Sequence, residues 1–224
     1  MDKFRIAVIR VVTIDDQEKL SLHGKLLEKY FPLFTTTSYC IPDQYDGIYD
    51  QVTYQKALPK IIALAERIAG EQDGLIISCA GDPAVRELKS RLAIPVSGAG
   101  MPTAVFSLNY GEQIGVLGIE ESPPAIYRSV LGKKMLAYQK PTAVANTNDL
   151  LTEAGRDSLL VAASELKASG SEALALACTG MSTIGIAPFL ERSLHLPVID
   201  PVIAEGLYLY ERCLAKHKQE AGID

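Results

Sequence analysis

Residues 64–83, LAERIAGEQDGLIISCAGDP, combine an amphipathic helix, a polar turn and an apolar run that ends at Cys79. The apolar residues Ile61, Leu64, Ala65 and Ile68 have the spacing of one helix face. The run 74–79 is short, apolar and bounded by turn residues, which is typical of a strand buried on both faces. A helix that leads directly into such a strand indicates a parallel sheet of the α/β type.

The same pattern returns in residues 163–182, ASELKASGSEALALACTGMS, which align without a gap. Cys178 then takes the position of Cys79, and Gly180 takes that of Gly81. Residues 88–96 (LKSRLAIPV) also match 190–198 (LERSLHLPV), and residues 5–10 (RIAVIR) match 113–118 (QIGVLG). Any two βαβ units share glycines and prolines for packing reasons, so those matches alone do not indicate a duplication. Cysteine is rarer, with only 4 among the 224 residues of the chain. The matched cysteines therefore favour an internal duplication.

Strands and helices are expected to alternate along the whole chain. Strands are predicted at residues 4–12, 33–40, 74–79, 94–97, 113–119, 142–145, 173–178 and 197–199. Helices are predicted from Asp15 or Asp16 to Tyr30, and at 53–70, 83–91, 122–134, 149–168, 184–193 and 204–218. This order predicts an α/β protein with two similar domains, mainly parallel sheets and pseudo-twofold symmetry, and a functional cleft between the domains.

Composition excludes several classes of partner. The net charge of -5 argues against nucleic acid and against an anionic membrane surface. No apolar run approaches the roughly 20 residues of a membrane helix, and the N-terminus lacks the features of a signal peptide, so a cytoplasmic protein is expected. The four cysteines are too few for a disulfide scaffold. The three histidines are scattered, so no metal site is predicted.

Cys79 and Cys178 are the candidate reactive groups. Ligands of parallel α/β sheets bind beyond the carboxyl ends of the strands, where both cysteines lie, so the thiols are expected to face each other across one cleft. Helices that begin after each cysteine would provide backbone amides that favour a thiolate. Two alternatives are inert packing cysteines and a redox pair, although the redox pair lacks the Cys-X-X-Cys spacing.

Two acid/base groups of one type suit the inversion of a carbon stereocentre. One thiolate would remove the proton from a carbon beside a carbonyl, and the other thiol would return a proton to the opposite face. Hydrogen bonds would hold the intermediate enolate, and no cofactor would be required. The partner implied is therefore a small-molecule substrate.

The chain resembles the aspartate/glutamate/hydantoin racemase superfamily, and within it the hydantoin racemase branch. The resemblance rests on residues 76–104, 174–206 and 114–122, with the paired cysteine segments as the most specific part. It implies two similar α/β domains, at residues 1–97 plus 204–224 and at 98–203, with the last helix returning to the first. It also implies cofactor-independent catalysis by Cys79 and Cys178, and a homo-oligomer. The substrate-binding residues implied are Arg10, Thr13, Ser78, Ala80, Gly118, Ile119, Thr179 and Gly180.

Some residues allow two interpretations. Asp82 is expected to cap the following helix, or alternatively to orient the thiol from behind without touching the substrate. Arg10 ends an apolar strand, so its partner is either a structural acid or a substrate carboxylate or ureide. The loop 41–49 is either a lid over the cleft or a connector. Cys40 and Cys213 have no counterpart in the other half and are expected to be packing residues.

The sequence therefore predicts a racemase without a cofactor, acting on a 5-substituted hydantoin. An aspartate- or glutamate-type amino-acid racemase and a non-catalytic small-molecule binding protein with two lobes are the alternatives. Relatives of this superfamily that are decarboxylases or other isomerases use one cysteine of the pair, so the presence of both favours racemisation.

Overall fold

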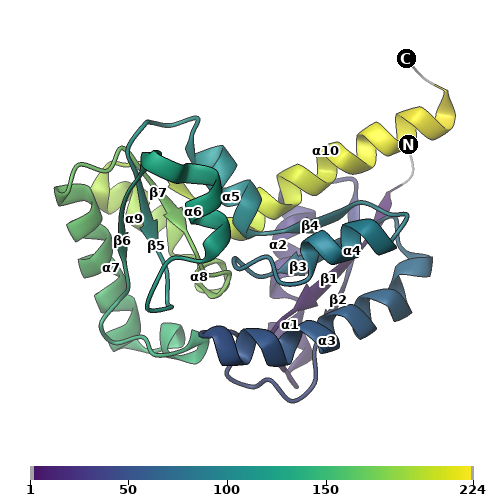
Figure 1. Cartoon of the computed structure of the whole chain (residues 1–224), viewed down its shortest axis with the longest axis horizontal. Helices are drawn as coiled ribbons and strands as arrows, with labels where there is room; N and C mark the ends of the chain where they lie inside the picture. Colours follow the sequence, from purple (N-terminus) through teal and green to yellow (C-terminus); the bar gives the residue numbers. More distant parts are fainter. Residues whose placement is uncertain (1–2, 223–224) are drawn as a thin grey trace.

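The computed structural model describes residues 3–222 and contains two four-stranded sheets in which the assigned strand pairs are all parallel. The first sheet has the order β2-β1-β3-β4, and the second has the order β6-β5-β7-β8. The strands are β1 (Phe4–Arg10), β2 (Phe34–Cys40), β3 (Gly74–Ser78), β4 (Val96–Gly98), β5 (Ile114–Leu117), β6 (Met135–Gln139), β7 (Ala173–Leu176) and β8 (Val198–Ile199). The second sheet repeats the strand order of the first, as an internal duplication predicts (Figure 1). The predicted α/β fold class is confirmed.

Helices connect successive strands and cover both sheets. They are α1 (Gln17–Leu20), α2 (Leu22–Tyr30), α3 (Gln51–Ile68), α4 (Val85–Arg91), α5 (Gly100–Ser107), α6 (Ala125–Leu131), α7 (Glu153–Ala168), α8 (Gly180–Thr183), α9 (Ala187–Leu194) and α10 (Pro201–Ala221). Three short 3-10 helices lie at Ala69–Glu71, Gly132–Lys134 and Thr147–Leu151.

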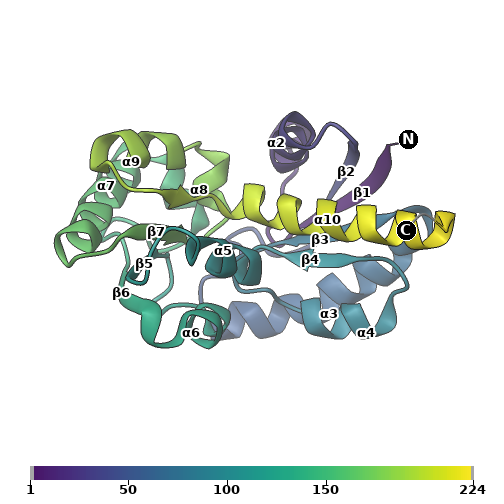
Figure 2. The same cartoon turned by 90° about the horizontal axis from the view of Figure 1, so that it is seen from above.

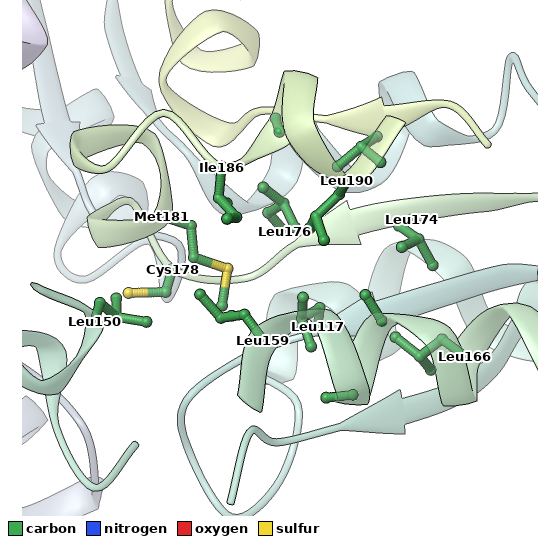
Figure 3. Close-up of a cluster of buried hydrophobic side chains, with 14 of the residues drawn as sticks. Leu117, Leu150, Leu159, Leu166, Leu174, Leu176, Cys178, Met181, Ile186 and Leu190 are labelled. Atoms are coloured by element: carbon green, nitrogen blue, oxygen red, sulfur yellow. The ribbon is translucent and has the colours of Figure 1, made fainter. Parts of the chain in front are cut away.

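The two faces of the first sheet form two separate cores. Alternate residues of β1 point to opposite faces, so Ile6 and Val8 pack with α2 and α10, whereas Ala7 and Ile9 pack with α3 and α4. The second sheet has the same layering. Leu174 of β7 packs with α7 and α9, as the close-up of this cluster shows (Figure 3), and its neighbour Ala175 packs with α5 and α6. Burial on both faces explains why these strands are apolar without alternation.

The last helix, α10, leaves the second sheet and returns to the first. It contacts α2, β3 and β4 on the first sheet and α5 beside the second (Figure 2). The predicted domain boundaries, at residues 97/98 and 203/204, remain a prediction. The ends of the first predicted domain, residues 1–2 and 223–224, lie outside the described residues.

The strand predicted at residues 142–145 is wrong. The chain forms β6 earlier, at Met135–Gln139, and residues 142–145 lie in a turn region. The error has a physical cause, because β6 is an edge strand whose residues are largely half-buried, so it lacks the apolar run of a central strand.

The sequence prediction also missed α5. No element was predicted between residues 97 and 113, but a helix begins at Gly100. Its start is fixed by a distant residue, because the Asp82 carboxylate accepts hydrogen bonds from the backbone N–H groups of Gly100 and Met101. No local signal in the sequence identifies that cap.

Candidate functional site

The two matched cysteines lie at the carboxyl ends of β3 and β7 and line one cavity. Cys79 and Cys178 are 9% and 8% exposed, and the cavity has a volume of about 30 Å³. Thr179 Oγ1 donates a hydrogen bond to the carbonyl oxygen of Ser78 at 3.1 Å. This bond joins the residue after Cys178 to the residue before Cys79. The structure therefore brings the two thiol-bearing segments together between the sheets.

Most of the residues predicted to bind substrate line this cavity. Besides the two cysteines, these are Arg10, Ser78, Ala80, Ile119, Thr179 and Gly180. The remaining lining residues are Val11, Val12, Gly47, Ile48, Gly81, Glu120, Thr147 and Ala177. The cavity has room for about one water molecule, so a larger ligand enters only if part of this wall moves.

Three predicted site residues, Thr13, Gly118 and Asp82, do not line the cavity. The Thr13 hydroxyl donates to the carbonyl of Ile41 at 2.8 Å and accepts from the N–H of Gln44 at 2.7 Å, so it holds the loop 41–49. At Gly118 a Cβ atom would lie 2.6 Å from the Tyr138 hydroxyl, which explains the glycine by packing.

The prediction that Asp82 caps the following helix is wrong. Asp82 and Ala84 have φ values of 50° and 61°, so the chain turns through the left-handed region and α4 begins only at Val85. The Asp82 carboxylate instead accepts from Gly100 and Met101 at 2.6 and 2.7 Å. Burial raises the pKa of Asp82 to about 6 despite these bonds. Asp82 thus ties the turn after Cys79 to α5.

Two loops, one from each sheet, cover the cavity. Gly47 and Ile48 of the loop 41–49 line it from one side, and Thr147 lines it from the other. The two loops meet where Asn148 Nδ2 donates to the carbonyl of Tyr45 at 3.3 Å. The loop 41–49 is therefore part of the cavity wall. The sequence prediction missed the contribution of Thr147. The repeat supplies a signal for it, because the loop that holds Thr147 follows the second strand of its sheet, as the loop 41–49 does in the first sheet.

Burial dominates the electrostatics of both thiols. It raises the pKa of Cys178 to about 11, although hydrogen bonds from the N–H groups of Gly180 and Met181 and the charge of Arg10 act in the opposite direction. It raises the pKa of Cys79 well above its usual value, where only the N–H of Gly81 opposes it. The predicted backbone amides are present and act in the expected direction, but desolvation outweighs them, so both pKa values are raised in sum.

Arg10 is 4% exposed and lies in the cavity wall. Its Nη2 donates to Thr183 Oγ1 at 3.5 Å, whereas its Nη1 has no hydrogen-bond partner among the described residues. Burial lowers the pKa of Arg10 to about 10, and the charge of Glu205 acts against this shift, so Arg10 is a cation at neutral pH. No carboxylate of the described residues forms an ion pair with Arg10, so one guanidinium nitrogen stays available.

A buried hydrogen-bonded chain lies behind Cys79. The Ser78 hydroxyl donates to Glu205 Oε1 at 2.6 Å and is hydrogen-bonded to His23 Nδ1 at 2.8 Å. His23 Nε2 is hydrogen-bonded to Thr183 Oγ1 at 2.9 Å. Burial lowers the pKa of His23 and raises that of Glu205, so the histidine is neutral. The sequence did not predict this chain, because its members are separated by up to 182 positions, from His23 to Glu205.

Within residues 3–222, no three or more His, Cys, Asp or Glu side chains are grouped so that they could hold a metal ion. In the same part of the chain, no helix has the length and apolar character that crossing a membrane requires.

Comparisons with known proteins identify the architecture. A family model described as Asp/Glu/Hydantoin racemase matches residues 20–205. An allantoin racemase from Klebsiella pneumoniae superposes with a TM-score of 0.78 at 22% identity, covering 96% of this chain and 89% of that chain. An allantoin racemase from Pseudomonas fluorescens gives 0.77 at 16% identity, with coverages of 98% and 92%. A glutamate racemase from Bacillus anthracis gives 0.70 at 15% identity, with coverages of 100% and 84%. These structural likenesses show the shared fold. No curated protein sequence matches the chain.

Proposed function

Because the chain belongs to the Asp/Glu/hydantoin racemase family, we propose that it is a racemase in which Cys79 and Cys178 exchange protons with opposite faces of one carbon stereocentre. The observation that carries this proposal is the placement of two buried cysteines at matched strand ends around one cavity. Packing alone would not require both cysteines to line the same cavity.

The reaction proposed needs only the groups of this chain. The thiolate of one cysteine takes the proton from the carbon, and the electron pair moves onto the adjacent carbonyl to form an enolate. The thiol of the other cysteine then returns a proton to the opposite face of the carbon. Each turnover therefore exchanges the roles of the two thiols, and no PLP or other cofactor takes part. Arg10, whose Nη1 has no other hydrogen-bond partner within residues 3–222, is placed to donate to the developing enolate oxygen.

We propose a 5-substituted hydantoin as the substrate. Allantoin, which names two of the similar structures, is itself a hydantoin substituted at C5. The carbonyl beside C5 acidifies the proton that is to be removed. Free aspartate or glutamate is the second candidate, supported by the similarity to a glutamate racemase.

The test is proton exchange at the stereocentre. The protein is incubated in deuterated water with hydantoins and amino acids, and loss of the proton signal is followed by NMR together with the decay of optical rotation. Cys79→Ser and Cys178→Ser are each expected to slow racemisation by roughly 10²- to 10⁴-fold, the usual contribution of an acid/base group. One-sided exchange can survive in either variant, because one thiol still faces the substrate.

Cys40→Ser is the matched control, because Cys40 is half-buried and does not line the cavity. It is expected to keep the wild-type rate. Near-normal turnover in Cys79→Ser or Cys178→Ser would contradict the two-thiol mechanism. If the wild type exchanges no substrate of the panel, the alternative of a non-catalytic binding protein with two lobes gains support.

A further inference from the structure

Glu120 is an unpartnered acidic side chain in the wall of the cavity. It follows β5, is half-buried and lines the cavity together with both cysteines. Among the described residues, its carboxylate has neither a hydrogen bond nor an ion pair. The neighbouring Glu121 differs in each respect, because its side chain is 89% exposed and pairs with Lys140. Glu120 therefore has no structural role comparable to that of its neighbour.

The charge of Glu120 works against the chemistry of the free protein. It raises the pKa values of both Cys79 and Cys178, and so disfavours the thiolate that removes the proton. Partial burial without a partner also destabilises the carboxylate itself. A ligand in the cavity that donates a hydrogen bond to Glu120 stabilises this carboxylate.

Arg10 provides the complementary group in the same wall. In the part of the chain that the structure describes, its Nη1 is a buried donor without a partner, and the charge of Glu205 acts on the guanidinium. The cavity thus offers one strong acceptor and one strong donor. The edge of an amide or ureide, with an N–H group beside a carbonyl, presents the matching pair.

We propose that Glu120 is a specificity-determining residue, whose carboxylate accepts a hydrogen bond from a substrate N–H group and disfavours substrates that carry a free carboxylate. This inference rests on the proposed function, and it assigns to one residue the selection of neutral ureides over α-amino acids. A substrate carboxylate in this small cavity would lie close to Glu120, where two negative charges repel each other with little screening.

The experiment compares Glu120→Gln with Glu121→Gln, which removes the same charge one residue away on the exposed side. Each protein is assayed with a neutral 5-substituted hydantoin and with the ring-opened N-carbamoyl amino acid, which carries a carboxylate. Binding of both compounds is also measured by calorimetry, so that the outcome does not depend on turnover. Selectivity is expressed as the kcat/KM, or the affinity, for the hydantoin divided by that for the carboxylate compound. Glu120→Gln is expected to lower this ratio by roughly 10- to 100-fold, since a hydrogen bond to a charged group is lost. Glu121→Gln is expected to leave the ratio unchanged.

An unchanged ratio in Glu120→Gln would overturn the proposal, as would a wild type that binds the carboxylate compound more tightly than the hydantoin. If the wild type binds the hydantoin selectively but exchanges no proton, the racemase function fails while the role of Glu120 is still decided by the binding ratio. If neither compound binds to the wild type, the assignment of Glu120 to ureide recognition is rejected.

Discussion

The strand ends at Cys79 and Cys178 occupy the same place in the repeat but have different surroundings. Cys178 is followed at once by α8, and the backbone N–H groups of Gly180 and Met181 act to lower the pKa of its thiol. Cys79 is followed by a turn through the left-handed region, and the N–H of Gly81 alone acts to lower the pKa of its thiol. The positive charge of Arg10 favours the Cys178 thiolate, whereas negative charges, including that of Asp82, disfavour the Cys79 thiolate.

The residues before the two cysteines also differ. Ser78 holds a polar chain with His23 and Glu205, whereas the matching residue, Ala177, belongs to an apolar cluster. Figure 3 shows Cys178 at the edge of a second apolar cluster, beside Leu150. A duplicated sequence can therefore place two identical groups symmetrically, while the packing around each makes one thiol easier to ionise.

The largest stability effect is expected at Ser78, the polar member of this pair. Ser78→Ala removes the hydroxyl that is bonded to His23 and Glu205, so two buried polar groups lose a partner. The expected loss is about 2–4 kcal/mol in the free energy of unfolding, measured by urea denaturation. Ser97→Ala is the matched control, because Ser97 is also fully buried but bonds only to the carbonyl of the next residue. Equal losses in the two variants would show that the polar chain adds no stability.

A smaller effect should separate the matched glycines, Gly81 and Gly180. A Cβ atom at Gly180 would lie 2.8 Å from side-chain atoms of both Leu150 and Thr147, whereas at Gly81 the nearest atom, on Tyr54, is 3.7 Å away. Gly180→Ala is expected to destabilise the protein by about 1–3 kcal/mol, and Gly81→Ala by less than about 0.5 kcal/mol. Denaturant unfolding of the two variants measures the difference. The asymmetry of the two strand ends would be refuted here if Gly81→Ala were the more damaging change.

The smallest effect concerns the reactivity of the two thiols. At pH 9, below the pKa of about 11 at Cys178, the reactive thiolate is a minor form whose population increases as the pH rises. Iodoacetamide is expected to modify Cys178 before Cys79, as mapped by mass spectrometry. Arg10→Met is expected to slow the modification of Cys178 by roughly two- to tenfold, and that of Cys79 by less, since the charge of Arg10 lowers the pKa of Cys178.

Arg10→Lys is the control for charge, and it should retain a Cys178 rate close to that of the wild type. An identical slowing at both cysteines would instead indicate a general change in access to the cavity.

Much of the site was predictable because the repeat placed it. The position of Cys178 relative to Cys79 followed from the alignment of two strand ends, and the carboxyl edge of a parallel sheet is where ligands bind. Arg10 was a candidate because it ends an apolar strand, and Ile119 was implied by the family resemblance; both line the cavity. Asp82 was misassigned because its partners, Gly100 and Met101, are 18 and 19 residues away and belong to a helix without a local signal.

The sequence by itself determined the α/β class and placed Cys79 and Cys178 at matched strand ends, because periodicity and residue type are local properties that recur at matched positions. The tertiary structure alone decided which groups surround each thiol. His23, Glu205 and Thr147 come from different elements, and only the packing of the two sheets brings them near the cysteines. Burial in that interface, a property of the whole fold, then sets the pKa values of both thiols.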